Sequence, residues 1–257
     1  MMKSGGRESE ARATTFIVIG GSTGLGRALA ERFATAGHSL VLVSSDLRDT
    51  QALAADLALR WGVQAVPVAL NLAEQALPLA TLDAALASLP PLTGLLLAAG
   101  MNREGDEPGQ APASFAALTC ANYTNLCNLV DHFLPRLRLA PNALIVGFGS
   151  VAATRGRTRN AAYSAAKRAL QSYFESLRHF LAGSGIKVQF YVLGYLDTNL
   201  AFGQRTLLPR ASPHRLADLV YRRKKRDFGS SYYPRFWLLV CELLRVLPWT
   251  VFRRLSF

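Results

Sequence analysis

A tyrosine and a lysine, Tyr163 and Lys167, stand four residues apart in the alanine-rich stretch AAYSAAK at 161–167. Positions i and i+4 lie on one face of a helix, so the phenol and the ammonium group would be neighbours there. Their reference pKa values, about 10 and about 10.4, make neither a ready proton donor at neutral pH. Because a nearby positive charge favours the phenolate and lowers the pKa of a tyrosine, the pair is a candidate proton-transfer device. The alternative is two unrelated surface or packing residues.

A glycine-rich turn, IGGSTGLG at 19–26, follows an apolar run and opens a helical pattern. Glycine permits positive φ angles and the close approach of a ligand, and the N-terminus of the following helix offers free N–H groups to a phosphate. Gly20, Gly24 and Gly26 therefore predict a dinucleotide site, the alternative being an ordinary strand–helix turn rich in glycine.

The second strand-like run ends in VSSDLR at 43–48. An acidic residue at this edge would bind the ribose 2′-hydroxyl of NAD. Ser44 and Ser45 stand there instead and offer hydroxyls to a 2′-phosphate, and Arg48 offers a positive charge. Asp46 argues in the other direction. The pattern favours NADP over NAD and leaves both open.

Short apolar runs alternate with helical patterns along most of the chain, which predicts an α/β fold with a doubly wound parallel sheet of the Rossmann type. The expected strands are 14–20, 39–44, 63–70, 92–99, 142–150 and 187–194. The expected helices are 24–36, 47–61, 73–88, 112–138, 161–183 and 213–224. We expect a disordered lead-in at 1–13, a single Rossmann domain at 14–231 and an amphipathic helical tail at 232–257.

Composition narrows the functional class. The 257 residues, half of them hydrophobic, are enough for one domain with a sizeable core. The three cysteines show no metal-binding spacing, and with a polar N-terminus without an apolar h-region they indicate an intracellular, reduced protein with no bound metal. The net charge is +12, and residues 205–257 hold twelve Arg or Lys against three Asp or Glu. This asymmetry points to a polyanionic partner: nucleic acid, an anionic membrane or a phosphorylated substrate.

Six motifs in order resemble the short-chain dehydrogenase/reductase family over about residues 14–200. They are GGSTGLG (20–26), AAG (98–100), ANYTN (121–125), GFGSVA (147–152), YSAAK (163–167) and LGYLDT (193–198). The resemblance implies that Tyr163 is the general acid in reduction and the base in oxidation, and that Lys167 lowers its pKa and binds the nicotinamide ribose. It also implies that Ser150 polarises the substrate carbonyl and that Asn122 holds a water linking Lys167 to solvent.

The same resemblance implies a cofactor site for NADP or NAD. Its residues would be Gly20, Ser22, Thr23, Gly24, Leu25, Gly26, Ser44, Ser45, Asn71, Gly100, Tyr163, Lys167 and Thr198. Asn71 stands where an aspartate often binds the adenine amine, which marks a divergent branch.

The substrate side carries two unusual features. Arg155, Arg157 and Arg159 lie in the loop 153–160, which borders the substrate mouth in this family, and arginine forks suit phosphate. A solvated charged loop is the alternative. The segment 199–213, the usual substrate lid, is short and suits a large or extended substrate.

The tail at 232–257 has an apolar run that is broken by Glu242 and Arg245 and ended by Pro248, too short to span a bilayer. Trp237, Trp249 and the basic flanks favour an in-plane contact with an anionic membrane. The alternative is a helix packed on the core or on another subunit of a homo-oligomer.

The order ANYTN, Arg-rich loop, YSAAK and RVLPWTVFRRLSF looks similar to the branch of the family that reduces a 2-keto pentose held on a polyprenyl phosphate, in the synthesis of cell-envelope arabinose. That similarity implies a lipid-linked keto substrate, a flavin oxidase partner and a cytoplasmic protein at the inner face of the membrane. Two alternatives stay open: a reductase of another lipid, such as a 3-keto sphingoid base or a steroid-like alcohol, and a non-catalytic nucleotide- or nucleic-acid-binding protein. The intact Ser150, Tyr163 and Lys167 set disfavours the last of these.

Overall fold

Seven parallel strands form the central sheet of the protein, in the order β3-β2-β1-β4-β5-β6-β7. The computed structural model describes residues 14–103, 106–109, 112–198 and 209–254. The strands are β1 (Thr15–Ile19), β2 (Ser39–Ser44), β3 (Ala65–Ala69), β4 (Leu92–Leu97), β5 (Leu144–Ser150), β6 (Lys187–Leu193) and β7 (Phe228–Tyr233). This topology confirms the predicted doubly wound parallel sheet.

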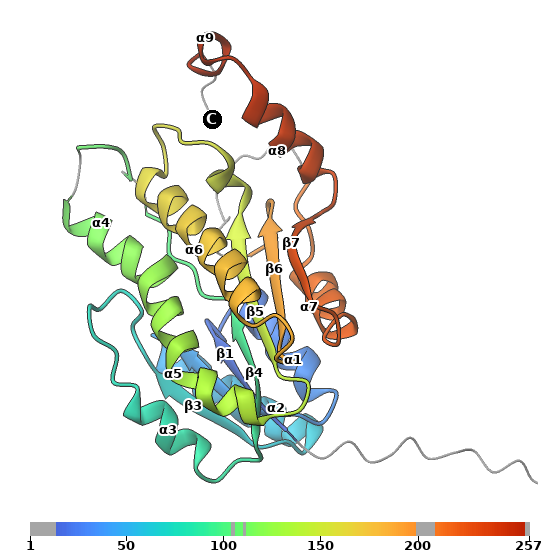
Figure 1. Cartoon of the computed structure of the whole chain (residues 1–257). Helices are drawn as coiled ribbons and strands as arrows, with labels where there is room; N and C mark the ends of the chain where they lie inside the picture. The colour runs from blue at the N-terminus through green and yellow to red at the C-terminus, as the bar shows by residue number, and fades with distance from the viewer. Residues whose placement is uncertain (1–13, 104–105, 110–111, 199–208, 255–257) are drawn as a thin grey trace, which may run out of the picture.

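Helices cover both faces of the sheet, as Figure 1 shows. They are α1 (Gly24–Ala34), α2 (Leu47–Trp61), α3 (Ala80–Leu86), α4 (Pro112–Thr119), α5 (Asn125–Leu139), α6 (Ala161–Phe180), α7 (Pro213–Arg222), α8 (Trp237–Val246) and α9 (Trp249–Phe252). Helices α3, α5 and α6 contribute Leu82, Phe133 and Phe174 to the core on one face. Helices α1 and α7 contribute Phe33 and Val220, among others, to the core on the opposite face.

The central strands are apolar on both sides because each face is covered. All five residues of β1 are buried, and Ile17 pairs with Val41 of β2 and with Leu95 of β4. Such continuous apolar runs are typical of parallel strands. The order of the strands reverses between β1 and β4, and the carboxyl ends of strands at this switch point form the crevice in which α/β proteins bind ligands.

Three elements differ from the sequence pattern. Helix α3 begins at Ala80 rather than near residue 73, because Pro78 disfavours the helical conformation of the residue before it. The long helix expected at 112–138 contains a π-helical turn, Cys120–Thr124, between α4 and α5. The pattern predicts six strands, and the structure adds β7 at the edge of the sheet, across the boundary expected between the domain and its tail.

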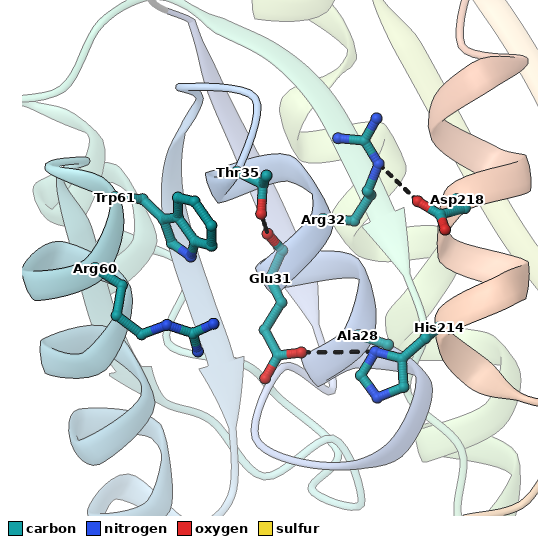
Figure 2. A pocket seen from close by; sticks show the side chains of 8 residues that line it. All are labelled: Ala28, Glu31, Arg32, Thr35, Arg60, Trp61, His214 and Asp218. Carbon is teal, nitrogen blue, oxygen red and sulfur yellow. Dashed lines mark hydrogen bonds and ion pairs between the residues drawn. The ribbon is translucent and has the colours of Figure 1, made fainter.

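Helix α7 is held onto α1 by an arginine–aspartate ion pair and a histidine–glutamate contact around a small cavity of about 210 Å³, seen in Figure 2. Arg32 Nε lies 2.8 Å from Asp218 Oδ1, and His214 Nδ1 lies 3.6 Å from Glu31 Oε2. The Arg32 guanidinium also stacks 3.7 Å above the ring of Tyr221. These partners satisfy one another, so we assign the cavity a role in packing.

Candidate active site

One large cleft, of about 1680 Å³, opens at the carboxyl ends of the strands. It brings together nearly every site residue predicted from the sequence. The predicted residues that line it are Gly20, Ser22, Thr23, Gly24, Leu25, Ser44, Ser45, Asn71, Gly100, Ser150, Arg155, Arg157, Arg159, Tyr163, Lys167 and Thr198. Gly26 and Asn122 are buried and are not among the residues that line it.

The glycine turn depends on its glycines for two different reasons. Gly20 has φ +82°, and a Cβ atom there would lie 2.8 Å from the Cα atom of Ala99. A Cβ at Gly26 would overlap the carbonyl oxygen of Gly20, so this glycine lets helix α1 start directly against the turn. The side chain of Thr23, the N-cap residue of α1, makes no capping hydrogen bond. The first amides of α1 are therefore a fitting cradle for a pyrophosphate.

The polar residues at the carboxyl end of β2 differ in whether they already have partners within the protein. Ser44 Oγ donates to the carbonyl oxygen of Asp46 at 3.0 Å and lies 2.8 Å from the hydroxyl of Thr50. The carboxylate of Asp46 accepts the N–H of Asp49 at 3.0 Å and so caps helix α2. Ser45 is exposed beside the cleft, and Arg48 is 91% exposed. The acidic group is thus engaged in the helix cap. Ser45 lines the cleft, whereas Arg48 lies outside the cleft lining with its guanidinium 3.5 Å from the carboxylate of Asp49, so the contact of either residue with a 2′-phosphate stays a prediction.

Asn71 lies where β3 ends and Thr198 lies after β6, and both line the cleft. The Asn71 side-chain oxygen accepts the N–H of Ala73 at 3.1 Å, which orders the loop there. A Cβ at Gly24 would come within 3.1 Å of the Thr198 methyl group, so Thr198 sits against the glycine turn. Both residues therefore lie on the cleft wall, and their contacts with a dinucleotide stay a prediction.

Tyr163 and Lys167 both start from the first two turns of α6 and face the cleft, as the i, i+4 spacing predicts. Burial raises the pKa of Tyr163, and a hydrogen bond with Ser150 and the positive charge of Arg157 act against that rise. The phenol is therefore protonated at neutral pH, which is the state that a proton donor requires. Arg157 thus supplies a positive charge that acts on the phenol, and the pKa-lowering role that the resemblance gives to Lys167 stays a prediction.

Lys167 is buried, and its Nζ donates to the backbone carbonyls of Phe148 at 3.1 Å and Ala99 at 3.3 Å. Burial lowers the pKa of this ammonium from 10.5 to about 8. The carbonyls belong to the end of β5 and the loop after β4, so Lys167 ties α6 to the middle of the sheet. It also sits on the cleft wall beside Gly100.

Ser150 ends β5, and its hydroxyl accepts the N–H of Ala152 at 3.2 Å. This bond caps the short 3₁₀ turn Val151–Thr154 and fixes the serine side chain at the floor of the cleft beside Tyr163. Its single hydrogen, which the hydrogen bond with Tyr163 uses here, can be donated to a substrate oxygen instead when a substrate is bound.

Asn122 is fully buried on the π-helical turn. Its amide nitrogen donates to the carbonyls of Met101 at 2.7 Å and Leu118 at 2.9 Å, and its oxygen accepts the N–H of Met101 at 3.1 Å. Asn122 thus holds the loop after β4 against the long helix. Its part in a water chain to Lys167 stays a prediction.

Asp106 is a site residue that the sequence pattern missed. Its buried carboxylate accepts the backbone N–H groups of Ala162 and Tyr163, each at 2.8 Å, and its own carbonyl accepts the N–H of Ala161 at 3.0 Å. A carboxylate at a helix N-terminus satisfies free N–H groups and meets the positive end of the helix dipole. Asp106 therefore fixes the first turn of α6, from which Tyr163 projects. A local sequence pattern could not predict this cap, because Asp106 precedes the start of α6 by more than fifty residues.

The three arginines of the loop before α6 have different surroundings. The Arg155 guanidinium donates to the carbonyls of Leu244, at 2.9 Å, and of Leu247, and lies 4.1 Å from the ring centre of Phe252. It therefore pins α8 and α9 to the cleft mouth. Arg157 acts on Tyr163, and Arg159 is exposed at the cleft edge. Most of the predicted lid, 199–208, lies outside the described residues.

Within the described ranges, no group of three or more His, Cys, Asp or Glu side chains is arranged to hold a metal ion. The groups that line the cleft include the phenol of Tyr163, the hydroxyl of Ser150, the ammonium of Lys167 and the guanidinium groups of Arg103, Arg155, Arg157 and Arg159.

Comparisons with known proteins agree with this geometry. The family model of short chain dehydrogenases matches residues 14–206. A sulfoacetaldehyde reductase of Chromohalobacter salexigens is 30% identical over 212 residues, covering 80% of this chain and 79% of the relative. A very-long-chain 3-oxoacyl-CoA reductase of Podospora anserina is 28% identical, covering 87% of this chain and 68% of the relative.

A solved structure of similar fold is a short-chain dehydrogenase from Sphingobium yanoikuyae in complex with NADPH. It has a TM-score of 0.76 and 26% identity, and the match covers 95% of this chain and 96% of that one. The matched family model spans the glycine turn, Ser150, Tyr163 and Lys167. The chain therefore belongs to the short-chain dehydrogenase family and is an oxidoreductase that uses NAD or NADP.

Proposed function

We propose that this oxidoreductase is a ketoreductase whose substrate is a ketone on a lipid-linked, phosphorylated molecule. The single observation that carries the proposal is the make-up of the substrate end of the cleft. Arg157 and Arg159 share it with the apolar side chains of Val240, Leu244 and Phe252 from α8 and α9. A cleft that joins guanidinium groups to an apolar wall matches a molecule with a phosphate and a hydrocarbon part.

The residues of this chain divide the work of reduction. A bound NADPH or NADH supplies the hydride that the carbonyl carbon accepts. Ser150 donates a hydrogen bond to the carbonyl oxygen and polarises it. Tyr163, protonated because burial raises its pKa, gives its proton to that oxygen, and the positive charge of Arg157 stabilises the phenolate left behind. Lys167 anchors α6 to the sheet and presents its ammonium beside the cofactor cradle.

We infer the chemical class of the substrate from the similarity of the sequence to one branch of the family. The chain looks similar to decaprenyl-phosphoryl-2-keto-erythro-pentose reductase, and we propose a polyprenyl-phosphate 2-keto pentose of cell-envelope arabinose synthesis as the ketone. An alcohol oxidase, by this proposal a flavin enzyme, must supply such a ketone. The 3-oxoacyl-CoA reductase relative supports a second candidate, a keto group on another lipid.

The test is a substrate panel assayed by NADPH and NADH oxidation. It contains a polyprenyl-phosphate 2-keto pentose, the same sugar without phosphate or lipid, a 3-keto sphingoid base, a 3-oxoacyl thioester and a short soluble ketone. We expect the phosphorylated lipid substrate to give the highest kcat/KM. Highest turnover of an uncharged lipid would favour the second candidate, and equal turnover of the bare sugar would contradict a lipid-linked substrate.

A paired substitution sharpens the test. Arg159→Ala removes a charge at the cleft edge, and we expect it to raise the KM for the phosphorylated substrate about tenfold, near 1.4 kcal/mol. The KM for the uncharged soluble ketone should not change. Arg168→Ala, an exposed position of α6 outside the cleft, is the matched control and should alter neither value.

A further inference from the structure

Helices α8 and α9, here called the tail helices, have two different apolar sides. One side closes the cleft: Trp237 and Phe252 are buried, and both line it together with Val240 and Leu244. A Cβ at Gly194 would overlap the indole of Trp237, so the helix is packed tightly onto the turn after β6. Arg155 holds its far end through the carbonyls of Leu244 and Leu247. The tail helices are thus a fixed wall of the active site.

The opposite side of the tail helices is apolar and open. Leu239, Leu243 and Val246 follow one another at spacings of four and three residues, which places them on one face of α8. Leu239 and Val246 are each 75% exposed, and Trp249 of α9 is 64% exposed. Seven of the thirteen large hydrophobic residues exposed in the described part of the chain lie between Phe236 and Val251. Scattered exposed leucines are ordinary, but such a concentration marks an interaction surface.

Positive charge surrounds this apolar face. Arg235, Arg253 and Arg254 are exposed at its two ends, and Arg245 is paired with Glu242. Residues 235–254 carry four arginines and one glutamate, a net charge of +3. Apolar side chains and an exposed tryptophan between arginines match a membrane interface with anionic headgroups. None of the helices in the described residues is long and apolar enough to cross a bilayer, and α8 has ten residues, so the contact would lie in the plane of the surface.

We propose that the tail helices dock on an anionic lipid bilayer and present the cleft mouth to it. Figure 1 shows α8 and α9 beyond the carboxyl ends of β5 and β6, projecting from the body of the protein. A segment whose inner side lines the cleft and whose outer side rests on lipid lets a lipid-held substrate reach Tyr163 without passing through water. Charge argues against a second copy as the occupant, because a symmetric contact would oppose two faces of like charge.

The experiment measures co-sedimentation of the full chain with two kinds of vesicle, phosphatidylcholine alone and phosphatidylcholine mixed with phosphatidylglycerol. We expect binding to the anionic vesicles that weakens as salt is raised. Leu239→Glu combined with Leu243→Glu should lower the apparent affinity at least tenfold. Leu59→Glu combined with Leu139→Glu is the matched control, because these leucines are 88% and 87% exposed on α2 and α5, and its binding should equal that of the unchanged chain.

Tryptophan fluorescence gives a second reading of the same contact. Anionic vesicles should shift the emission of the full chain to shorter wavelength, and Trp249→Phe should remove most of that shift. Trp237 is buried in the cleft wall and Trp61 lies on α2, so neither should respond. An equal shift in the Trp249→Phe variant would overturn the proposal.

Three other outcomes would also overturn it: no vesicle binding by the unchanged chain, equal loss in both double variants, or a dimer that the tail variant alone dissolves. NADPH binding, followed by nicotinamide fluorescence, checks that each variant is folded. It also separates this proposal from the proposed function, since a chain that binds vesicles and NADPH but reduces no lipid ketone would contradict the function alone.

Discussion

The carboxylate of Asp106 is expected to set the position of Tyr163, and Asp106→Asn tests this. The carboxylate is buried and accepts two backbone N–H groups at 2.8 Å. Asparagine keeps one acceptor oxygen but turns the other into an NH₂ group, which would face the amide N–H of Ala162 or Tyr163. One charge-assisted hydrogen bond, about 1.5–3 kcal/mol, is lost. The weaker interaction with the helix dipole adds about 0.3–1 kcal/mol.

The free energy of unfolding should therefore fall by about 2–4 kcal/mol in Asp106→Asn, measured by urea denaturation. The catalytic effect should be a lower kcat with little change in the Kd for NADPH, because the glycine turn is untouched. A shift of 1 Å in a reacting group costs about a hundredfold, so a partial shift of the first turn of α6 should lower kcat by roughly tenfold or more. The assay is steady-state reduction of a short soluble ketone.

Asp83→Asn is the control for this measurement. Asp83 lies on α3, outside the cleft, and its carboxylate pairs with His132 and Arg136 of α5. It should lose stability while keeping the original kcat. If Asp106→Asn likewise keeps kcat, or if both variants lose kcat in proportion to stability, then Asp106 has no special role in positioning Tyr163.

The remaining predictions concern the cofactor edge, the buried lysine and the tail. Arg48→Ala should raise the Kd for NADPH about tenfold and leave that for NADH unchanged, measured by nicotinamide fluorescence; an equal effect on both would remove Arg48 from the 2′-phosphate site. Lys167 has a pKa of about 8 when folded and 10.5 as its ordinary value, so its cost to stability is complete below pH 8 and disappears toward pH 10.5. The stability of the unchanged protein relative to Lys167→Met should therefore rise by about 1 kcal/mol between about pH 7 and about pH 9, and a difference that is flat with pH would contradict the lowered pKa. Arg155→Ala should loosen the tail helices and speed tryptic cleavage at Arg245 or Arg253 by tenfold or more, with NADPH binding intact; unchanged cleavage would show that Arg155 does not hold the tail.

The reaction class could be predicted from the sequence because its signals are local or periodic. Tyr163 and Lys167 share a face through helical spacing alone. The glycines of 20–26 predict a tight turn, and in the structure a Cβ atom at Gly20 or Gly26 would be too close to neighbouring backbone atoms. The strands at the centre of the sheet were predictable since burial on both faces leaves an apolar run.

Other features depend on distant partners, which leave no pattern. Asp106 is one acidic residue in a loop until α6 packs beside it. Strand β7, FGSSYY, is an edge strand with a single partner and is only partly buried, so it lacks the continuous apolar run of the central strands. Arg155 lies in the same basic loop as Arg157 and Arg159. Only the packing of the tail helices shows that Arg155 is the arginine that binds the carbonyl of Leu244.

The central claim, that Tyr163 delivers the proton in a nicotinamide-dependent reduction, is tested most directly by Tyr163→Phe in a single-turnover experiment. The variant is mixed with NADPH and a ketone that the unchanged enzyme reduces, and the decay of NADPH absorbance is followed. We expect unchanged NADPH binding and a rate of reduction lowered by about a hundredfold or more, the usual size of a general-acid contribution. NADPH oxidation by Tyr163→Phe at the rate of the unchanged enzyme would contradict the mechanism.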